Sequence, residues 1–228
     1  MGESRGVLIL GFPPYESMRH LRRPRWWLAL PIIACSLAAC AGNPSDGGEG
    51  TIMPDSVTLH PGDVVLRCGA GMLSHAVLLA EGSKGIYSHV GIVADSAGLP
   101  MVIHAVPDEP DYEGDPDRVK MESPAKFFSR RQAIRGAVMS HHDSTAAHRA
   151  AQVATAVYRR HTLFDHDYND HDTTSMYCTE LVVFAFSRAH APLSGISTHR
   201  LPLPGLDYEC VLPSDITACK DFHTIISF

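Results

Sequence analysis

The sequence has no surplus of positive charge, and this lack removes one large class of partners. Its 228 residues contain 19 Lys and Arg against 25 Asp and Glu, for a formal net charge of -6. Residues 1–39 contain five Arg and two Glu, so the rest of the chain carries 14 bases against 23 acids. Proteins that bind nucleic acid gather Lys and Arg on one face. We therefore expect no nucleic-acid partner.

Long apolar runs are also missing, except for one near the N-terminus. The basic segment His20–Arg25 precedes the apolar segment Trp26–Leu37 and then small residues, an order typical of a secretory signal. The apolar run is shorter than the roughly 20 residues of a membrane-spanning helix. Its end, Leu37-Ala38-Ala39-Cys40, resembles the lipobox of bacterial lipoproteins. The resemblance implies lipidation of Cys40 and a place in the bacterial cell envelope, favouring the outer membrane on its periplasmic side.

The chain is too short to leave much room for a second domain. Residues 1–39 are predicted to be a signal peptide of the lipoprotein type, with a possible true start at Met18. Residues 40–55 are rich in Gly, Pro and polar side chains and predict a flexible tether. Residues 56–228 then form one domain, in which no internal repeat or low-complexity block is visible.

The hydrophobic pattern of the domain predicts an α+β fold. Strands are predicted at 64–68, 87–94, 101–106 and 134–139, and helices at 73–80, 124–128, 144–160 and 178–190. Asp95–Gly98 predicts a hairpin turn, and Ser144 or Thr145 is expected to cap the helix that follows. The last helix is apolar nearly all round and should be buried. Because helices flank a run of strands, we expect a small antiparallel sheet or half-barrel packed against helices.

Three residues of this domain suggest nucleophilic catalysis. Cys178 falls in the first turn of the buried helix, where free backbone N–H groups and the helix dipole favour a thiolate. His89 lies within the second predicted strand and His104 within the third, both flanked by apolar residues. If the two strands pair, one ring could orient the other. The pattern indicates a Cys–His site in which His89 is the base.

Several segments resemble one enzyme superfamily. The motifs GDVV from Gly62, YSHVGIV from Tyr87 and YCTELV from Tyr177 look like signature segments of the NlpC-type papain-like cysteine hydrolases. Because the histidine precedes the cysteine, the sequence resembles the circularly permuted, YiiX/YebB-like branch. The segments FDHDY from Phe164 and LPSD from Leu212 are also similar to that branch, so the resemblance extends over most of the domain.

The resemblance implies a papain-like fold of permuted topology, with Cys178 as nucleophile and His89 as base. Many permuted members have Glu at the position of His104, although Cys–His–His sites occur in the wider superfamily. The Cys178 N–H is the expected oxyanion donor. Three motif residues are expected to support the site: Ser88, Tyr177 and Glu180. Glu180 would point away from the sulfur and accept hydrogen bonds at the helix start.

The substrate is left open by the sequence. Relatives cleave peptide amides of the cell wall or act on lipid-linked acyl groups, so the partner is a peptidoglycan fragment or a lipid-linked substrate. An amide hydrolase, a lipid acyltransferase or thioesterase, and a non-catalytic lipid- or glycan-binding lipoprotein all remain possible. We expect no cofactor. The spacing of His161, His166 and His171 matches no common zinc site, and a solvated acidic loop is the simpler interpretation.

The remaining cysteines raise the question of disulfides, because an exported protein meets an oxidising environment. Cys210 and Cys219 flank a short segment with turn residues. A bridge between them is one possibility, and two small buried thiols are the other. Cys68 ends an apolar strand and is expected to be free.

Overall fold

The computed structural model describes residues 50–168, 172–200 and 209–228, which belong to one compact unit, Ser45–Phe228. The strands are β1 (Val64–Cys68), β2 (His89–Ser96), β3 (Leu99–Val106), β4 (Arg118–Glu122), β5 (Arg135–His141), β6 (Leu163–Phe164), β7 (Ser175–Met176), β8 (His199–Arg200), β9 (Glu209–Cys210) and β10 (Phe222–Ser227). The helices are α1 (Met72–Glu81), the 3-10 turn η1 (Gly82–Lys84), α2 (Pro124–Phe127), α3 (Ser144–Arg159), α4 (Cys178–Arg188) and α5 (Pro213–Ala218). The α+β class is confirmed.

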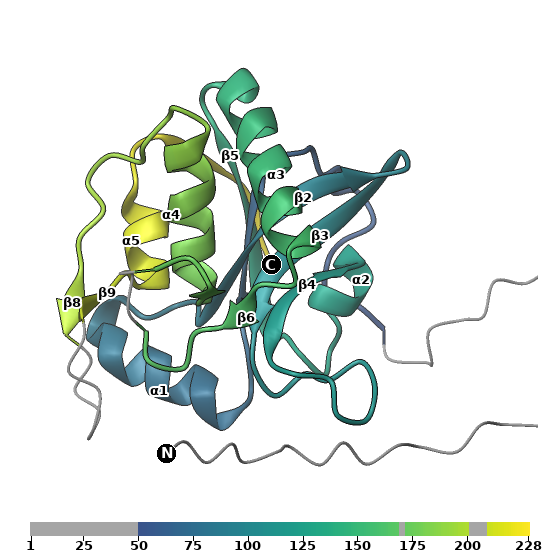
Figure 1. Ribbon diagram of the computed structural model, residues 1–228, viewed down its shortest axis with the longest axis vertical. Helices are drawn as coiled ribbons and strands as arrows, with labels where there is room; N and C mark the ends of the chain where they lie inside the picture. Colours follow the sequence, from purple (N-terminus) through teal and green to yellow (C-terminus); the bar gives the residue numbers. More distant parts are fainter. Residues whose placement is uncertain (1–49, 169–171, 201–208) are drawn as a thin grey trace, which may run out of the picture. The chain divides into compact units, whose positions relative to one another are not determined.

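The main sheet runs in the order β10-β5-β1-β2-β3-β4-β6-β7. Its pairs are antiparallel apart from the short parallel pair of β6 and β7. Helices α3 and α4 pack together on one face (Figure 1). Side chains alternate across the sheet, so Val64 and Leu66 meet these helices while Val65 faces the opposite side. A mostly antiparallel sheet packed against helices is therefore what the sequence predicted.

The opposite face of the sheet is covered by a smaller apolar cluster. Phe127 and Phe128, at the end of α2, pack edge to face with ring centroids 4.8 Å apart. Ile52 and Met53 join this cluster, and Thr51 forms a β-bridge to Ser129. The packed part of the chain thus reaches farther toward the N-terminus than the predicted start at residue 56, because these side chains cover the sheet.

The hairpin of β2 and β3 is formed as predicted, but its turn has two residues rather than the four of Asp95–Gly98, because the strands extend to Ser96 and from Leu99. Ala97 and Gly98 have φ values of 56° and 84°, as such a turn requires, and Ser96 pairs with Leu99. The predicted cap of α3, Ser144 or Thr145, is wrong. The cap is Asp143, whose side chain accepts hydrogen bonds from the N–H groups of Thr145 and Ala146, and Ser144 is the first residue of the helix.

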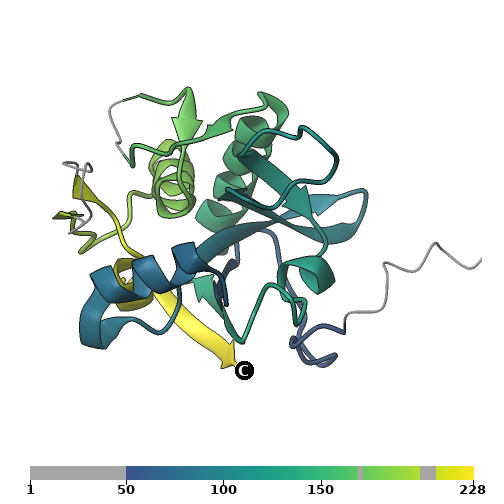
Figure 2. The same cartoon turned by 90° about the horizontal axis from the view of Figure 1, so that it is seen from below.

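Helix α1 lies on the other side of the molecule from α3, beside α5, in both views (Figures 1 and 2). A hydrogen bond joins α1 to α5: Glu81 Oε1 accepts the N–H of Ser214 at 2.9 Å. Among the described residues, no helix has the length and apolar character needed to cross a membrane.

Candidate active site

Cys178 is the first residue of α4. The helix can begin here because Glu180 Oε2 accepts the Tyr177 N–H at 3.1 Å, which satisfies one of the donors that every helix start leaves unpaired. Glu180 therefore has the structural place that the sequence predicted for it. Its buried carboxylate fixes the start of the helix, and with it the position of the sulfur.

The surroundings of the sulfur contain several backbone donors. The N–H groups of Val90, Thr179 and Cys178 itself are directed at it. Burial nevertheless dominates and raises the pKa of Cys178 to about 11. The donors at the helix start do favour the thiolate, as expected, but the desolvation of the sulfur outweighs them. Val90 directly follows His89, so this contact brings the Cys178 sulfur to the start of β2.

His89 and His104 are in direct contact. The Nε2 atom of His89 lies 2.8 Å from the Nδ1 atom of His104, and both residues are buried. The two rings meet at an angle of 78° and pack against the Phe127 ring. The pairing of β2 with β3 thus brings the two predicted histidines together, as the hairpin pattern indicated.

The structure adds a fourth residue that the sequence analysis missed. Glu122, at the end of β4, is buried, and its Oε1 atom lies 3.1 Å from His104 Nε2. The distance fits an ion pair, although the ring N–H does not point along the line between the two atoms. Burial alone would raise the pKa of Glu122, but the contact with His104 and the charges of Arg67 and Lys126 hold it at about 2. A carboxylate therefore stands behind the second histidine.

These contacts favour one arrangement of the ring protons when each ring carries one. The Glu122 carboxylate can only accept, which favours the proton of His104 on Nε2, the nitrogen that faces it. Nδ1 of His104 then accepts from Nε2–H of His89. This leaves Nδ1 of His89 with a free electron pair, which is what a base for the Cys178 thiol needs.

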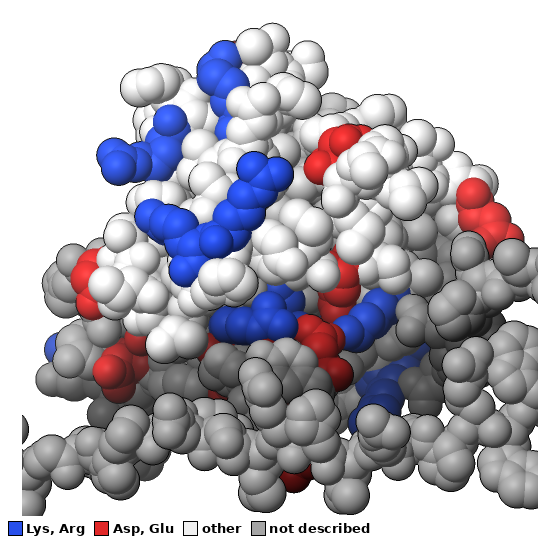
Figure 3. Space-filling model, turned by 45° about the vertical axis from the view of Figure 1, so that its right-hand side comes forward, with Lys and Arg blue, Asp and Glu red and all other residues white. Residues whose placement is uncertain are grey.

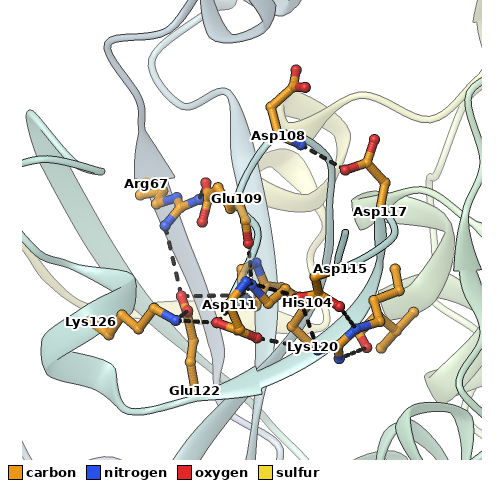
Figure 4. Close-up of polar contacts among 12 residues, drawn as sticks. Arg67, His104, Asp108, Glu109, Asp111, Asp115, Asp117, Lys120, Glu122 and Lys126 are labelled. Atoms are coloured by element: carbon orange, nitrogen blue, oxygen red, sulfur yellow. Dashed lines mark hydrogen bonds and ion pairs between the residues drawn. The ribbon is translucent and has the colours of Figure 1, made fainter. Parts of the chain in front are cut away.

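Arg67, a residue of β1, brings a buried positive charge into this region. Its guanidinium is buried, donates to the Phe127 carbonyl at 3.0 Å, binds Glu109 and lies 4.0 Å from Glu122 (Figure 4). Burial lowers the pKa of His89 well below its usual value, and the charges of Arg67 and His104 lower it further. His89 is therefore neutral at pH 7 and able to accept a proton.

The loop between β3 and β4 is held over Arg67 by ion pairs. Asp111 binds Lys126 at 2.6 Å and Lys120 at 2.9 Å, while Arg118 binds Asp115 at 2.8 Å. Figure 4 shows these groups converging beneath the loop, and basic and acidic side chains also adjoin on the face in Figure 3. The loop is thereby fixed so that Glu109 can reach Arg67.

Two cavities of different character meet at the site. One is almost entirely apolar and is lined by Cys178, Leu73, Val77 and Leu212, among others. The other is polar and is lined by His89, Arg67, Glu109 and further residues of the same loop. Ser88 lines both, and its Oγ accepts the Gly69 N–H at 3.0 Å. A substrate could therefore place an apolar group beside Cys178 and a polar group beside His89.

Tyr177 and Tyr168 both line the apolar cavity. The Tyr177 hydroxyl accepts the Val211 N–H at 3.1 Å and so anchors the chain directly after β9. Burial raises the pKa of Tyr168 above its usual value, and the nearby Cys178 adds to the effect. Tyr168 was not among the predicted site residues, although it belongs to the FDHDY segment that the resemblance singled out.

The remaining cysteines and the candidate metal ligands complete the comparison with the sequence. Cys210 and Cys219 are free thiols, so the proposed bridge between them is not formed. Cys219 instead contacts Asp221 Oδ2 at 3.5 Å, whereas Cys210 faces the apolar cavity. Cys40 and His171 lie outside the described residues. Within the described part of the chain, no group of three or more His, Cys, Asp or Glu side chains is placed to hold a metal ion.

Comparison with known proteins supports the fold. No family model matches this chain, and no curated protein is significantly similar to it. A solved structure described as that of metalloprotein YiiX from Escherichia coli O157:H7 does match, with a TM-score of 0.58. It shares 17% sequence identity, over 74% of this chain and 97% of that chain. The fold is YiiX-like. At this level of identity, the likeness concerns the fold alone.

Proposed function

We propose that this chain is an exported, lipid-anchored cysteine hydrolase that cleaves an amide bond through a thioester. The observation that supports the proposal best is the buried series Glu122–His104–His89, together with a Cys178 sulfur at a helix start that is contacted by the N–H of Val90, the residue after His89. Buried polar groups carry a cost unless they are paired. A series of three such groups, whose last member directly precedes the residue that contacts a thiol, has a direct use in catalysis and little use in packing.

The proposed reaction begins with a neutral pair. Nδ1 of His89 takes the proton of Cys178 as the sulfur attacks the substrate carbonyl. The negative oxygen that forms is stabilised by the Cys178 N–H at the helix start, and the positive charge on His89 is stabilised through His104 by Glu122. His89 then protonates the leaving amine, and water resolves the thioester.

The proposed substrate is an amide of a peptidoglycan stem peptide or a related compound. The lipid on Cys40 would keep the domain in the cell envelope, facing the periplasm, within reach of the cell wall. The polar cavity beside His89 contains charged groups that suit a peptide. The apolar cavity favours a second candidate, a lipid-linked acyl group whose chain lies beside Cys178.

The decisive experiment is to incubate the purified protein with cell-wall fragments and, separately, with lipid acyl donors, and to identify the products by mass. Cys178→Ala and His89→Ala are expected to abolish turnover and to remain folded. His104→Ala should retain more activity than His89→Ala, because it only orients the base. Normal activity in either of the first two variants would contradict the proposal.

Two further measurements separate the alternatives. A chelator should leave a cysteine hydrolase active and stop a metallohydrolase. Cys40→Ser should release the protein from the membrane fraction, and a variant that stayed bound would contradict the lipid anchor. If neither substrate class reacted while one of them bound, the chain would be a binding lipoprotein.

A further inference from the structure

Cys210 lies beside the nucleophile although the two are far apart in sequence. Thr179 Oγ1 donates to the Val211 carbonyl at 2.6 Å, and the Val211 N–H donates to the Tyr177 hydroxyl at 3.1 Å. The two residues that flank Cys178 therefore both hold the residue that follows Cys210. This brings β9 against the start of α4.

Both thiols also face the same space. Cys178 and Cys210 line the apolar cavity together, and Cys210 is 2% exposed. Burial raises the pKa of Cys210, and the charge of Cys178 adds to this effect, as it does for Tyr168 in the same cavity. The second thiol has no part in the reaction described above.

We propose that Cys178 and Cys210 form a reversible disulfide when the protein meets a hydroperoxide. The site would then have a second state, in which the nucleophile is blocked and the apolar cavity is crossed by the bond. This modification is independent of the substrate, so it stands or falls separately from the proposed hydrolase activity.

The chemistry balances with a hydroperoxide as the oxidant. The Cys178 sulfur, after losing its proton to His89, attacks the peroxide oxygen, which gives a sulfenic acid and releases water or an alcohol. The Cys210 thiolate then attacks that sulfur, the S–S bond forms, and the sulfenic oxygen leaves as water. Two thiols lose one electron each, and the peroxide gains two. A dithiol reductant reverses the change.

The other described cysteines are placed differently. Cys68 is in β1, where its thiol contacts the Gly69 carbonyl at 3.8 Å. Cys219 follows α5 and contacts Asp221. Neither lines the apolar cavity. Cys210 is thus the described thiol in position to resolve an oxidised Cys178, and without it the sulfenic acid would be open to further oxidation.

The test uses the full chain in detergent, treated with hydrogen peroxide at pH 8.5, blocked with N-ethylmaleimide and digested with trypsin without reduction. We expect a linked pair of the peptides 161–188 and 201–220, two hydrogens lighter than their sum, that separates on treatment with dithiothreitol. Because Cys210 and Cys219 share peptide 201–220, the variant Cys219→Ser is the matched control and should give the same linked pair.

The variant Cys210→Ser should lose the linked pair and accumulate sulfinic or sulfonic acid at Cys178. Thermal unfolding of each variant shows whether it is folded. If Cys210→Ser does not fold, the peptide maps of the unmodified chain and of Cys219→Ser decide the question. Two results would overturn the proposal. In the variant Cys219→Ser, the linked pair would disappear. In the unmodified chain, Cys178 would be unchanged, or oxidised to an acid, while Cys210 remained a free thiol.

Discussion

Nδ1 of His104 faces Nε2 of His89 at 2.8 Å, while the other ring nitrogen of His104 faces Glu122 at 3.1 Å. His104 is fully buried between the two. It therefore links the Glu122 carboxylate to the ring of His89. This arrangement uses three neighbouring strands, β2, β3 and β4, and each contributes one member.

The first prediction concerns Glu122. Glu122→Gln keeps the size of the side chain but removes the charge that holds the proton of His104 on Nε2. We expect kcat to fall by roughly 10- to 100-fold, as for other residues that orient a functional histidine. Steady-state kinetics measure the effect. Glu113→Gln, an exposed carboxylate of the neighbouring loop, is the control and should be unaffected. Equal rates in the two variants would contradict the role of Glu122.

The same residue should also make stability depend on pH. The pKa of Glu122 is lowered from 4.5 to about 2 in the folded protein. Its stabilising contribution, on the order of 3 kcal/mol, is present above pH 4.5 and is lost as the pH falls toward 2. Urea unfolding between pH 7 and pH 3 should show a steeper loss for the unmodified chain than for Glu122→Gln. Parallel curves would indicate that the carboxylate is not stabilised in the fold.

The second prediction concerns the protonation of the reacting pair. Because the pKa of His89 is lowered, the base stays neutral in mild acid, and the acid limb of kcat/KM should lie well below pH 6.5. Because the pKa of Cys178 is about 11, its alkylation by iodoacetamide should be slow at pH 7. The rate should rise about tenfold per pH unit up to about pH 10. A plateau already at neutral pH would mean a resting thiolate.

The sequence allowed part of this site to be predicted because the relevant signals are local. The strand around His89 and the buried helix after Cys178 each have a hydrophobic pattern that can be read without the rest of the chain. The two histidines meet because one short turn joins their strands. Local pattern, together with the resemblance, was enough to select Cys178 at its helix start and the two histidines that the structure brings into contact.

Glu122 and Arg67 were missed for a different reason. The segment Arg118–Glu122 alternates charged and apolar residues, which suggests a strand with a solvent-facing side. In the fold, that charged side is buried, because Lys120 and Glu122 find partners on other elements. Such pairs depend on contacts between distant segments, which no local pattern contains. The raised pKa of Cys178 could not be expected from the local pattern either, since its burial is set by the packing of the whole site.

The third prediction concerns Gly91, a residue of β2 whose backbone lies close to His104 of β3. A Cβ atom at Gly91 would be 2.7 Å from Val102 Cγ1 and 3.2 Å from His104 Cβ. Gly91→Ala should therefore push β3 away from β2 and weaken the contact with His89, at a cost of about 1–3 kcal/mol. We expect a lower free energy of unfolding together with a lower kcat. Gly98→Ala, in the hairpin turn, lies in open space but has a φ of 84° and should reduce stability without the loss of kcat.

The fourth prediction separates the two substrate candidates. Ala76 is a half-buried residue of α1 that lines the apolar cavity beside Cys178. Ala76→Leu would add three carbon atoms to the cavity wall and leave less room for an acyl chain. If the substrate is lipid-linked, the variant should lose kcat/KM for a long-chain ester and keep it for an acetyl ester, because only the long chain needs the cavity.

Ala125→Leu, on α2 at the opposite face of the sheet, is the matched control, since it makes the same change away from the cavity. For an amide substrate whose side chains occupy the polar cavity, Ala76→Leu should leave the cleavage of cell-wall fragments within about twofold of the unmodified chain. A difference of 1–2 kcal/mol between the two ester substrates corresponds to a 5- to 30-fold change in relative rate, which ordinary kinetics resolve easily. Equal losses for both esters would mean that the substitution disturbs Cys178 itself, and the apolar cavity would then carry no specificity.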